Sequence, residues 1–307
     1  MPLSGTQASA RGEPVLRVGS MGELLDFDTT GANLDAEFQL HYHEAGEGPT
    51  LILLHGSGPG VSGWSNFRGN MPVFATTFRT IVLDLPGFGL SAPVTIDQPY
   101  SKIAARAVRV LMDSLGIDKA HLLGNSMGGS VTGHFALAYP DRADRLVMMG
   151  PGGLAVNVFS PDVSEGAKRL REFLAAPSRE GMVAWVDCMV EDKSVVTDEL
   201  IDERMANAMR PGVIESSREI FASFRDPRFS NEPPLWAKAA SISHPTLITW
   251  GRDDRMLLYE SGLFAFRRMP NAELHVFSGC GHWAQVERKS DFERVVTEFL
   301  TRPGPRK

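Results

Sequence analysis

The segment Gly124-Asn125-Ser126-Met127-Gly128 constrains the fold of this chain more than any other feature. It has the spacing Gly-x-Ser-x-Gly, and an apolar run at residues 120–123 precedes it. A strand, a tight turn and a helix in that order hold a serine on a strained elbow with its hydroxyl exposed. Backbone N–H groups at the helix start suit an oxygen that is becoming negative. The motif therefore predicts that Ser126 is a nucleophile.

Short apolar runs bounded by glycine and proline recur along the chain and predict buried parallel strands. One helical pattern between them can be capped by Ser101. Repeated alternation of strand and helix predicts an α/β fold, with a mostly parallel twisted sheet and helices on both faces. The expected strands lie at residues 37–43, 51–54, 79–83, 121–123, 145–149, 246–250 and 273–277.

Residues 152–235 break this alternation, because helical patterns dominate there and no strand pattern is present. An insertion of this kind would cover the strand ends, where open α/β sheets bind ligands. We therefore expect a helical cap inserted between two strands of the sheet. The expected organisation is a flexible arm at 1–20, a core made of 21–151 and 236–304, and a cap at 152–235.

Composition excludes several classes of function. The formal net charge of −6 argues against a nucleic-acid binder. No run of 18 apolar residues predicts a membrane span, and residues 1–14 lack the apolar centre of a signal peptide. Cys188 and Cys280 are expected to be buried free thiols in a reducing compartment. We expect a cytoplasmic protein that uses no metal and no cofactor.

A serine hydroxyl becomes a good nucleophile when a base takes its proton, and a carboxylate usually orients that base. In folds with this elbow the order along the chain is serine, acid, histidine. The acid candidate is Asp254, in the loop after the strand at 246–250. The adjacent Asp253 competes with it, and a turn hydrogen bond is the alternative role for that side chain.

The base candidate is His282, which lies in a glycine-rich loop after the last expected strand. His55 is its main rival, although a structural role in the turn of its own loop fits that position better. Position, chain order and the glycine-rich setting together favour His282. The expected catalytic triad is Ser126, Asp254 and His282.

The oxyanion of a tetrahedral intermediate needs two hydrogen-bond donors. One is expected to be the N–H of Met127, directly after the nucleophile. The other is expected from the loop at 55–60, by position the N–H of Ser57. A plain tight turn is the alternative for this loop. A phosphate-binding loop is disfavoured because the lysine of that motif is missing.

Arg204 lies on a predicted helix at 198–209, on one ridge with Leu200 and Ala208. A buried charge without a partner is unfavourable, so this arginine needs one. The partner could be a protein carboxylate or, through snorkelling, solvent. It could equally be a substrate carboxylate held in bidentate fashion. Trp283, next to His282, is either a pocket wall or a core aromatic, and its position alone does not decide between them.

Six segments together resemble the meta-cleavage-product hydrolases, which are α/β-hydrolase-fold enzymes that split carbon–carbon bonds in the bacterial breakdown of aromatic and steroid-derived rings. The resemblance covers about residues 35–300. Two local departures are Leu257-Leu258, where the family usually has proline, and Val286, where it has tryptophan. The segments are His-Gly-Ser-Gly-Pro-Gly at 55–60, Gly-Trp-Ser-Asn at 63–66, Gly-Asn-Ser-Met-Gly-Gly at 124–129, Gly-Pro-Gly-Gly at 150–153, Gly-Arg-Asp-Asp-Arg at 251–255 and Gly-His-Trp-Ala-Gln at 281–285.

The resemblance implies the same triad and a small-molecule dienoate substrate. It also implies assembly into a homodimer or a larger homo-oligomer. It favours the functional interpretation of Arg204. The substrate contacts expected around the dienoate end are Gly58, Asn66, Asn125, Arg204 and Trp283, and Met189, Met205 and Met256 are candidates for the cap side of the pocket.

The expected reaction is hydrolysis of a 2-hydroxy-6-oxo-hexa-2,4-dienoate to a 2-hydroxypenta-2,4-dienoate and a carboxylic acid, after ketonisation of the dienol. A carboxylesterase on the same fold is the alternative, since the triad fits it equally well. A ligand-binding protein without catalysis is a third possibility, which a complete triad disfavours.

Overall fold

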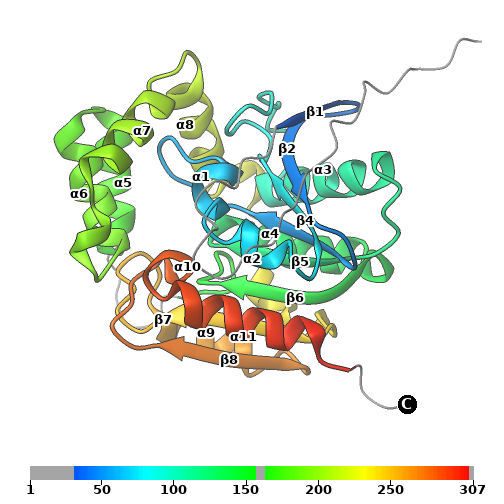
Figure 1. Cartoon of the computed structure of the whole chain (residues 1–307). Coiled ribbons are helices and arrows are strands. Elements are labelled where there is room, and N and C mark those ends of the chain that lie inside the picture. Colours follow the sequence, from blue (N-terminus) through cyan, green and yellow to red (C-terminus); the bar gives the residue numbers. More distant parts are fainter. Residues whose placement is uncertain (1–30, 157–162, 304–307) are drawn as a thin grey trace, which may run out of the picture.

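An eight-stranded sheet forms the centre of the structure, a computed structural model that describes residues 31–156 and 163–303 (Figure 1). The strand order is β1-β2-β4-β3-β5-β6-β7-β8. The pairs β1–β2 and β2–β4 are antiparallel, and all the other neighbouring pairs are parallel. The strands are β1 (Ala32–Asp35), β2 (Gln39–Ala45), β3 (Thr50–Leu54), β4 (Arg79–Leu83), β5 (Ala120–Asn125), β6 (Ala143–Met149), β7 (Thr246–Gly251) and β8 (Ala272–Phe277).

All seven expected strands are present, and β4 agrees residue for residue. The expected strand at 37–43 begins two residues too early, because β2 spans Gln39–Ala45. β1 was not predicted. It has four residues and alternates between intermediate and exposed positions, so it lacks the apolar run by which the other strands were recognised. The predicted arm at 1–20 lies outside the described residues.

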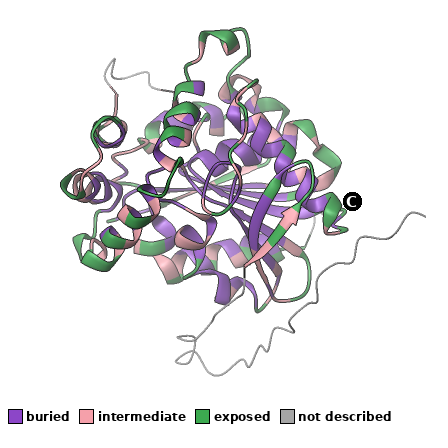
Figure 2. Ribbon diagram, turned by 90° about the horizontal axis from the view of Figure 1, so that it is seen from above, coloured by how far each residue is buried: buried purple, intermediate pink, exposed green. Residues whose placement is uncertain are grey.

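Helices cover both faces of the sheet, and alternate side chains of one strand belong to different cores. On β3, Leu51 and Leu53 pack in one core, whereas Ile52 and Leu54 pack in the other. This follows from the two-residue period of a strand. Figure 2 shows buried strands between helices whose outer surfaces are exposed. The first core includes α1 (Gly63–Phe67), α2 (Met71–Phe74) and α11 (Lys289–Thr301), and the second includes α3 (Tyr100–Ser114), α4 (Met127–Ala138) and α9 (Tyr259–Phe266).

The start of α3 differs from the prediction. The helix begins at Tyr100 with Pro99 at the N-cap position, so Ser101 does not cap it. Ser101 is buried instead, and its hydroxyl donates to Ser130 Oγ of α4 at 3.0 Å. Proline suits a helix start because its φ angle already matches the helix. Ser101 therefore joins two helices rather than terminating one.

A group of four helices lies between β6 and β7, beyond the carboxyl ends of the strands (Figure 1). Ser164, Ser178 and Thr197 cap three of them by accepting a backbone N–H. Their apolar faces pack into a separate core that also includes Trp283. This agrees with a helical insertion, and the boundaries at 152 and 235 stay a prediction. The helices are α5 (Glu165–Ala175), α6 (Arg179–Met189), α7 (Asp198–Ala208) and α8 (Val213–Ser223).

The remaining elements are short. Within 31–156 and 163–303, no helix is long and apolar enough to cross a membrane. Both cysteines are free and buried, as predicted. The short elements are α10 (Ala284–Glu287) and the 3₁₀ turns η2 (Pro140–Arg142), η3 (Lys193–Val195), η4 (Pro227–Phe229) and η5 (Leu235–Ser241).

Ser62 caps α1, and a buried carboxylate binds the first residue of that helix. Asp84 accepts the N–H of Gly63 at 2.6 Å and the N–H of Leu90 at 2.9 Å, and it pairs with His41 Nδ1 at 2.8 Å. Burial alone would raise the pKa of Asp84. The hydrogen bonds, chiefly the one from His41, outweigh burial and hold that pKa below its usual value. Asp84 therefore adds stability above its unfolded-state pKa, and this stability is lost as pH falls through the lower folded-state pKa.

Asp84→Ala should lower the free energy of unfolding at neutral pH by about 3 kcal/mol or more, because three donors, two of them buried, lose their acceptor. Urea denaturation followed by circular dichroism measures this. Asp97→Ala, at an exposed position, serves as the control and should stay within about 0.5 kcal/mol of wild type. Equal effects of the two substitutions would contradict the role given to Asp84.

Candidate active site

Ser126 stands alone between the end of β5 and the start of α4, with φ of 53° and ψ of −111°. It is the one residue other than glycine with positive φ among those described. A side chain at Gly124 would come within 2.1 Å of the Gly128 carbonyl oxygen. A side chain at Gly128 would come equally close to the carbonyl oxygen of Leu54. The predicted strand, tight turn and helix are present, and the Gly-x-Ser-x-Gly spacing follows from how tightly this turn packs.

The acid and base candidates meet. His282 Nδ1 lies 2.7 Å from Asp254 Oδ2, and both side chains are buried. The second oxygen of Asp254 accepts the N–H groups of Met256 and Leu257 at 2.8 and 2.9 Å. These contacts hold the carboxylate in one orientation. Because Nδ1 faces the carboxylate, Nε2 is the nitrogen left to accept a proton from a serine.

Asp253 and His55, the alternative acid and base candidates, bind other parts of the protein. Asp253 is only partly buried, contacts Arg252, and accepts the N–H of Cys280 at 3.3 Å. His55 Nε2 accepts the N–H of Leu85 at 3.0 Å, so its proton is on Nδ1, which donates to the Gly56 carbonyl at 2.6 Å. Burial lowers the pKa of His55, which keeps the ring neutral. The ring therefore joins the glycine-rich loop to the loop after β4.

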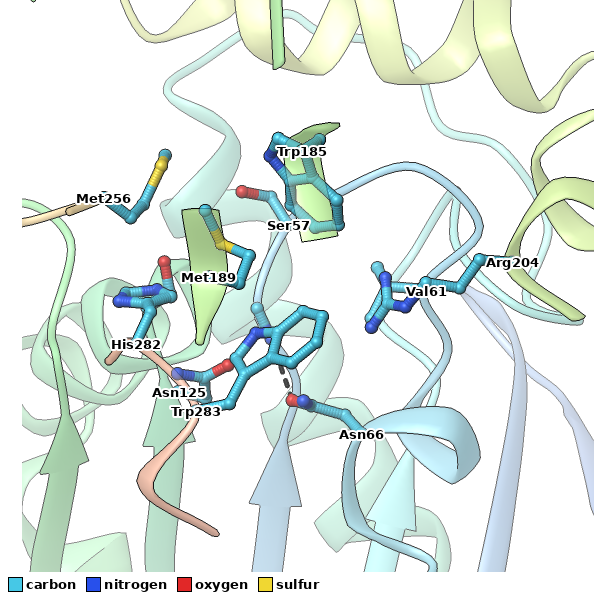
Figure 3. A pocket seen from close by; sticks show the side chains of 12 residues that line it. Ser57, Val61, Asn66, Asn125, Trp185, Met189, Arg204, Met256, His282 and Trp283 are labelled. Carbon is cyan, nitrogen blue, oxygen red and sulfur yellow. Dashed lines mark hydrogen bonds between the residues drawn. The ribbon is translucent and has the colours of Figure 1, made fainter. Parts of the chain in front are cut away.

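Ser126 and His282 line one cavity at the junction of the core and the helical insertion (Figure 3). Its open volume is about 10 Å³, room for about one water molecule. With the side chains in this arrangement, the cavity is too small for a ligand larger than a few atoms. The lining residues are Gly56, Ser57, Val61, Asn66, Asn125, Ser126, Trp185, Met189, Arg204, Met256, His282 and Trp283.

Ser57 and Met127 are the two residues whose N–H groups are predicted to form an oxyanion hole, and that role stays a prediction. Met127 is the first residue of α4, where backbone N–H groups have no acceptor within the helix. Ser57 lies in the loop after β3 and lines the cavity. Gly58 does not line it, because the ring of Trp185 covers this residue: a Cβ there would be 2.5 Å from the ring. Gly58 therefore shapes the site by allowing Trp185 to approach.

Both asparagines reach the cavity from the core. The side-chain oxygen of Asn66 accepts the N–H of Gly56 at 3.2 Å, which leaves its amide N–H groups for a ligand. The side-chain N–H of Asn125 donates to the Met149 carbonyl at 3.4 Å. Asn66 and Arg204 lie on one side of the cavity in Figure 3, whereas Met189, Met256 and His282 lie on the other.

Arg204 is a buried cation, only 3% exposed, and it lies within 4 Å of no carboxylate among the described residues. The neighbouring Glu203 pairs with Arg68 instead, at 2.8 Å. Arg204 Nη1 donates to the Pro59 carbonyl at 3.2 Å, and its buried Nε has no partner. Burial lowers the pKa of Arg204 to about 10, so the guanidinium remains protonated at neutral pH.

Two tryptophans surround this guanidinium. Its central carbon lies 4.7 Å from the ring centre of Trp283 and 5.4 Å from that of Trp185. Cation–π attraction of this kind compensates part of the lost hydration. The buried indole N–H of Trp185 also has no partner. Two unpaired donors in one cavity wall favour a ligand that brings oxygen acceptors.

The sequence interpretation missed Trp185, and two residues that it included, Gly58 and Met205, do not line the cavity. Trp185 lies on α6 one turn before Met189, so the i, i+4 spacing of these large apolar residues was the available signal. Met205 does not line the cavity and packs in the core of the inserted helices instead. Met189 and Met256 do line it. The described residues hold no group of three histidine, cysteine or carboxylate side chains suited to a metal ion.

Comparison with known proteins places this site in a family. Residues 51–296 match the alpha/beta hydrolase family. The chain is 42% identical over 271 residues to a 2-hydroxy-6-oxo-6-phenylhexa-2,4-dienoate hydrolase of Burkholderia cepacia, an alignment covering 86% of this chain and 92% of that protein. It is also 42% identical over 268 residues to a 2-hydroxy-6-oxononadienedioate/2-hydroxy-6-oxononatrienedioate hydrolase of Comamonas testosteroni, with the same coverage.

Comparison with solved structures indicates the same family. A meta-cleavage product hydrolase from Pseudomonas fluorescens IP01 matches with a TM-score of 0.78 at 36% identity, covering 89% of this chain and 97% of that one. A 2-hydroxy-6-oxo-6-phenylhexa-2,4-dienoate hydrolase from Rhodococcus sp. strain RHA1 matches with a TM-score of 0.81 at 29% identity, covering 90% and 99%. The chain is therefore an α/β hydrolase. Within that fold it belongs to the meta-cleavage-product hydrolases, which confirms the resemblance seen in its motifs.

Arg204→Met should raise the free energy of unfolding by about 1 kcal/mol, because an apolar side chain replaces a buried, unpaired charge. Denaturant unfolding measures this. Leu200→Ala, on a partly buried apolar side chain of the same helix, is the comparison and should destabilise the protein. If Arg204→Met destabilises as much as Leu200→Ala, the fold itself requires the guanidinium.

Proposed function

We propose that this protein hydrolyses the carbon–carbon bond of a 2-hydroxy-6-oxo-hexa-2,4-dienoate, releasing a 2-hydroxypenta-2,4-dienoate and a carboxylic acid. The observation that carries this proposal is Arg204. A buried guanidinium without a carboxylate partner lines the same cavity as Ser126 and the paired His282. The names of the relatives in Burkholderia and Comamonas, which are dienoate hydrolases, support the same substrate class.

The chemistry requires more than a triad. Cleavage of a ketone releases a carbanion, which is feasible only when a neighbouring carbonyl delocalises its charge. Tautomerisation of the dienol to the 2,6-diketo form supplies that carbonyl. We assign to Arg204 the task of holding the carboxylate and the 2-oxo group, a charge-assisted interaction that favours the ketone form. The unpaired N–H of Trp185 is a second donor available to these oxygens.

The three residues of the proposed triad carry out the nucleophilic steps. His282, oriented by Asp254, accepts the proton of Ser126 as the serine oxygen attacks the C6 carbonyl. The N–H groups of Ser57 and Met127 stabilise the oxyanion that forms. The bond between C5 and C6 then breaks, its electron pair passes to the delocalised dienolate, and His282 returns a proton. Water hydrolyses the remaining acyl group and restores Ser126.

The dienoate has a defined direction in this proposal. Its carboxylate lies toward Arg204, Asn66 and Trp283. The group beyond the C6 carbonyl lies toward Met189 and Met256, on the opposite side of the cavity (Figure 3). The proposal also includes a homo-oligomeric assembly and a cytoplasmic location, for which gel filtration and cell fractionation are the direct measurements.

Ser126→Ala should lower kcat for a 6-phenyl dienoate by about 1,000-fold or more, because the nucleophile is lost. Binding should persist, since Arg204 and the asparagines remain. Bleaching of the yellow dienol measures turnover, and the spectral shift of the bound dienol measures affinity. Near-normal turnover would show that Ser126 is not the nucleophile. Failure of a serine-directed phosphonate to label the wild-type protein would instead favour a binding protein without catalysis.

Arg204→Ala should lower kcat/KM for the dienoate by about 100-fold, the effect of losing a buried charge-assisted contact. Hydrolysis of an aryl acetate should change by less than about 5-fold, because that ester has no carboxylate to bind. Arg68→Ala, at the exposed arginine that pairs with Glu203, is the matched control and should leave both reactions unchanged. Equal losses on both substrates would favour a carboxylesterase and contradict the role of Arg204.

A further inference from the structure

The end of α6 is joined to both loops that carry the acid and base candidates. The N–H of His282 donates to the Met189 carbonyl at 2.7 Å. Arg255, which follows Asp254, donates from Nη2 to the carbonyls of Asp187 and Val190 at 2.5 and 3.1 Å. The segment 187–192, defined here as the α6 end, therefore lies against the loop of the acid and the loop of the base.

Glu287 connects the α6 end to the loop of the base. Its Oε2 accepts the N–H groups of Glu191 and Asp192 at 2.6 and 2.9 Å. Its Oε1 accepts the N–H of Gly281 at 2.8 Å, directly before His282. A single carboxylate thus receives three backbone donors from two segments that are far apart in the sequence.

Glycine at position 281 is part of the same junction. A Cβ there would lie 2.7 Å from the Met189 carbonyl oxygen and 2.9 Å from Cα of Val190. Contacts under 3 Å force a backbone shift, so only glycine lets the loop of the base approach the α6 end this closely. The tight contact and the carboxylate bridge therefore determine the same relative position.

Glu287 has no cationic partner in the part of the chain that the structure describes: no charged nitrogen of a lysine, arginine or histidine lies within 4 Å of its carboxylate oxygens. Burial raises the pKa of Glu287, although its backbone hydrogen bonds oppose that rise. The carboxylate is thus retained in a partly desolvated position by hydrogen bonding alone. Such a group is suited to orienting backbone rather than to binding solvent ions.

We propose that Glu287 is a positioning residue for His282, because its carboxylate holds the loop of the base against the α6 end. It touches no substrate. It acts through the backbone of Gly281, which sets where the imidazole stands relative to Ser126. The inference rests on the proposed roles of Ser126 and His282, and it does not depend on which bond is hydrolysed.

Glu287→Gln tests this proposal. Glutamine has the same shape, but its amide N–H₂ would face at least one of the backbone N–H groups that the carboxylate accepts. A displacement of His282 by less than 1 Å is enough to lower kcat by about 10- to 100-fold. The loss should be equal for the dienoate, for an aryl acetate and for phosphonate labelling of Ser126, because the same imidazole serves all three.

A second measurement separates positioning from general distortion. In the Ser126→Ala background, Glu287→Gln should leave the affinity for the 6-phenyl dienoate within about 3-fold, because Arg204 lies on α7 and not on the α6 end. Glu191→Gln is the matched control: its exposed side chain changes while its backbone N–H stays in the bridge, and all rates should be unchanged. Glu287→Asp keeps the charge with a shorter reach and should recover part of the lost kcat.

Three results would overturn the proposal: unchanged kcat in Glu287→Gln, a loss of dienoate affinity as large as the loss of kcat, or no recovery in Glu287→Asp. If Glu287→Gln does not fold, the same comparison of kcat with affinity is made on Glu287→Asp. Failure of the proposed carbon–carbon hydrolysis would give a different result. Phosphonate would then label Ser126 in the wild-type protein and the aryl acetate would be hydrolysed, but the dienoate would remain intact.

Discussion

The close packing around the β5–α4 turn is the constraint on which the rest of the site depends. Gly124 and Gly128 leave no space for side chains, so the backbone at Ser126 is held in a conformation that costs about 1–3 kcal/mol. The N–H of Ser126 donates to the Met149 carbonyl at 2.8 Å, at the end of the adjacent strand. Because these contacts belong to the centre of the sheet, the strain is offset by the packing of two cores. The other loops of the candidate site follow β3, β7 and β8, and they line the same cavity as Ser126.

A second constraint opposes stability. Arg204 is buried without a carboxylate, and two unpaired donors stand in one cavity wall. Groups of this kind lower the stability of a fold unless a ligand completes their hydrogen bonds. The rings of Trp185 and Trp283 reduce this penalty by cation–π attraction without supplying an acceptor. These features support the proposed binding of an anionic, oxygen-bearing group at one end of the cavity and an apolar group at the other.

Much of this arrangement could be predicted from residues. The core strands were recognisable because buried parallel strands are continuous apolar runs. The candidate triad could be proposed because serine, acid and histidine follow strands in that order. β1 escaped detection because a short edge strand carries no such run. The prediction that Ser101 caps a helix was wrong. Serine occurs at helix caps, but it also occurs at buried positions where its hydroxyl binds another side chain, as it does here. Trp185 was missed because a helix pattern shows that a face is buried without showing what it is buried against.

The sequence by itself determined the fold class and the family and predicted the nucleophile, because these depend on local patterns: apolar runs, glycine spacing and motif order. The tertiary structure alone decided which of Asp253 and Asp254 faces His282, since adjacent carboxylates differ only in direction. It also decided that Arg204 has no protein partner and that Glu287 bridges the α6 end to the loop of the base. These facts depend on distances between segments that are far apart in the chain. A sequence pattern does not contain these distances, because they are set only when the chain folds.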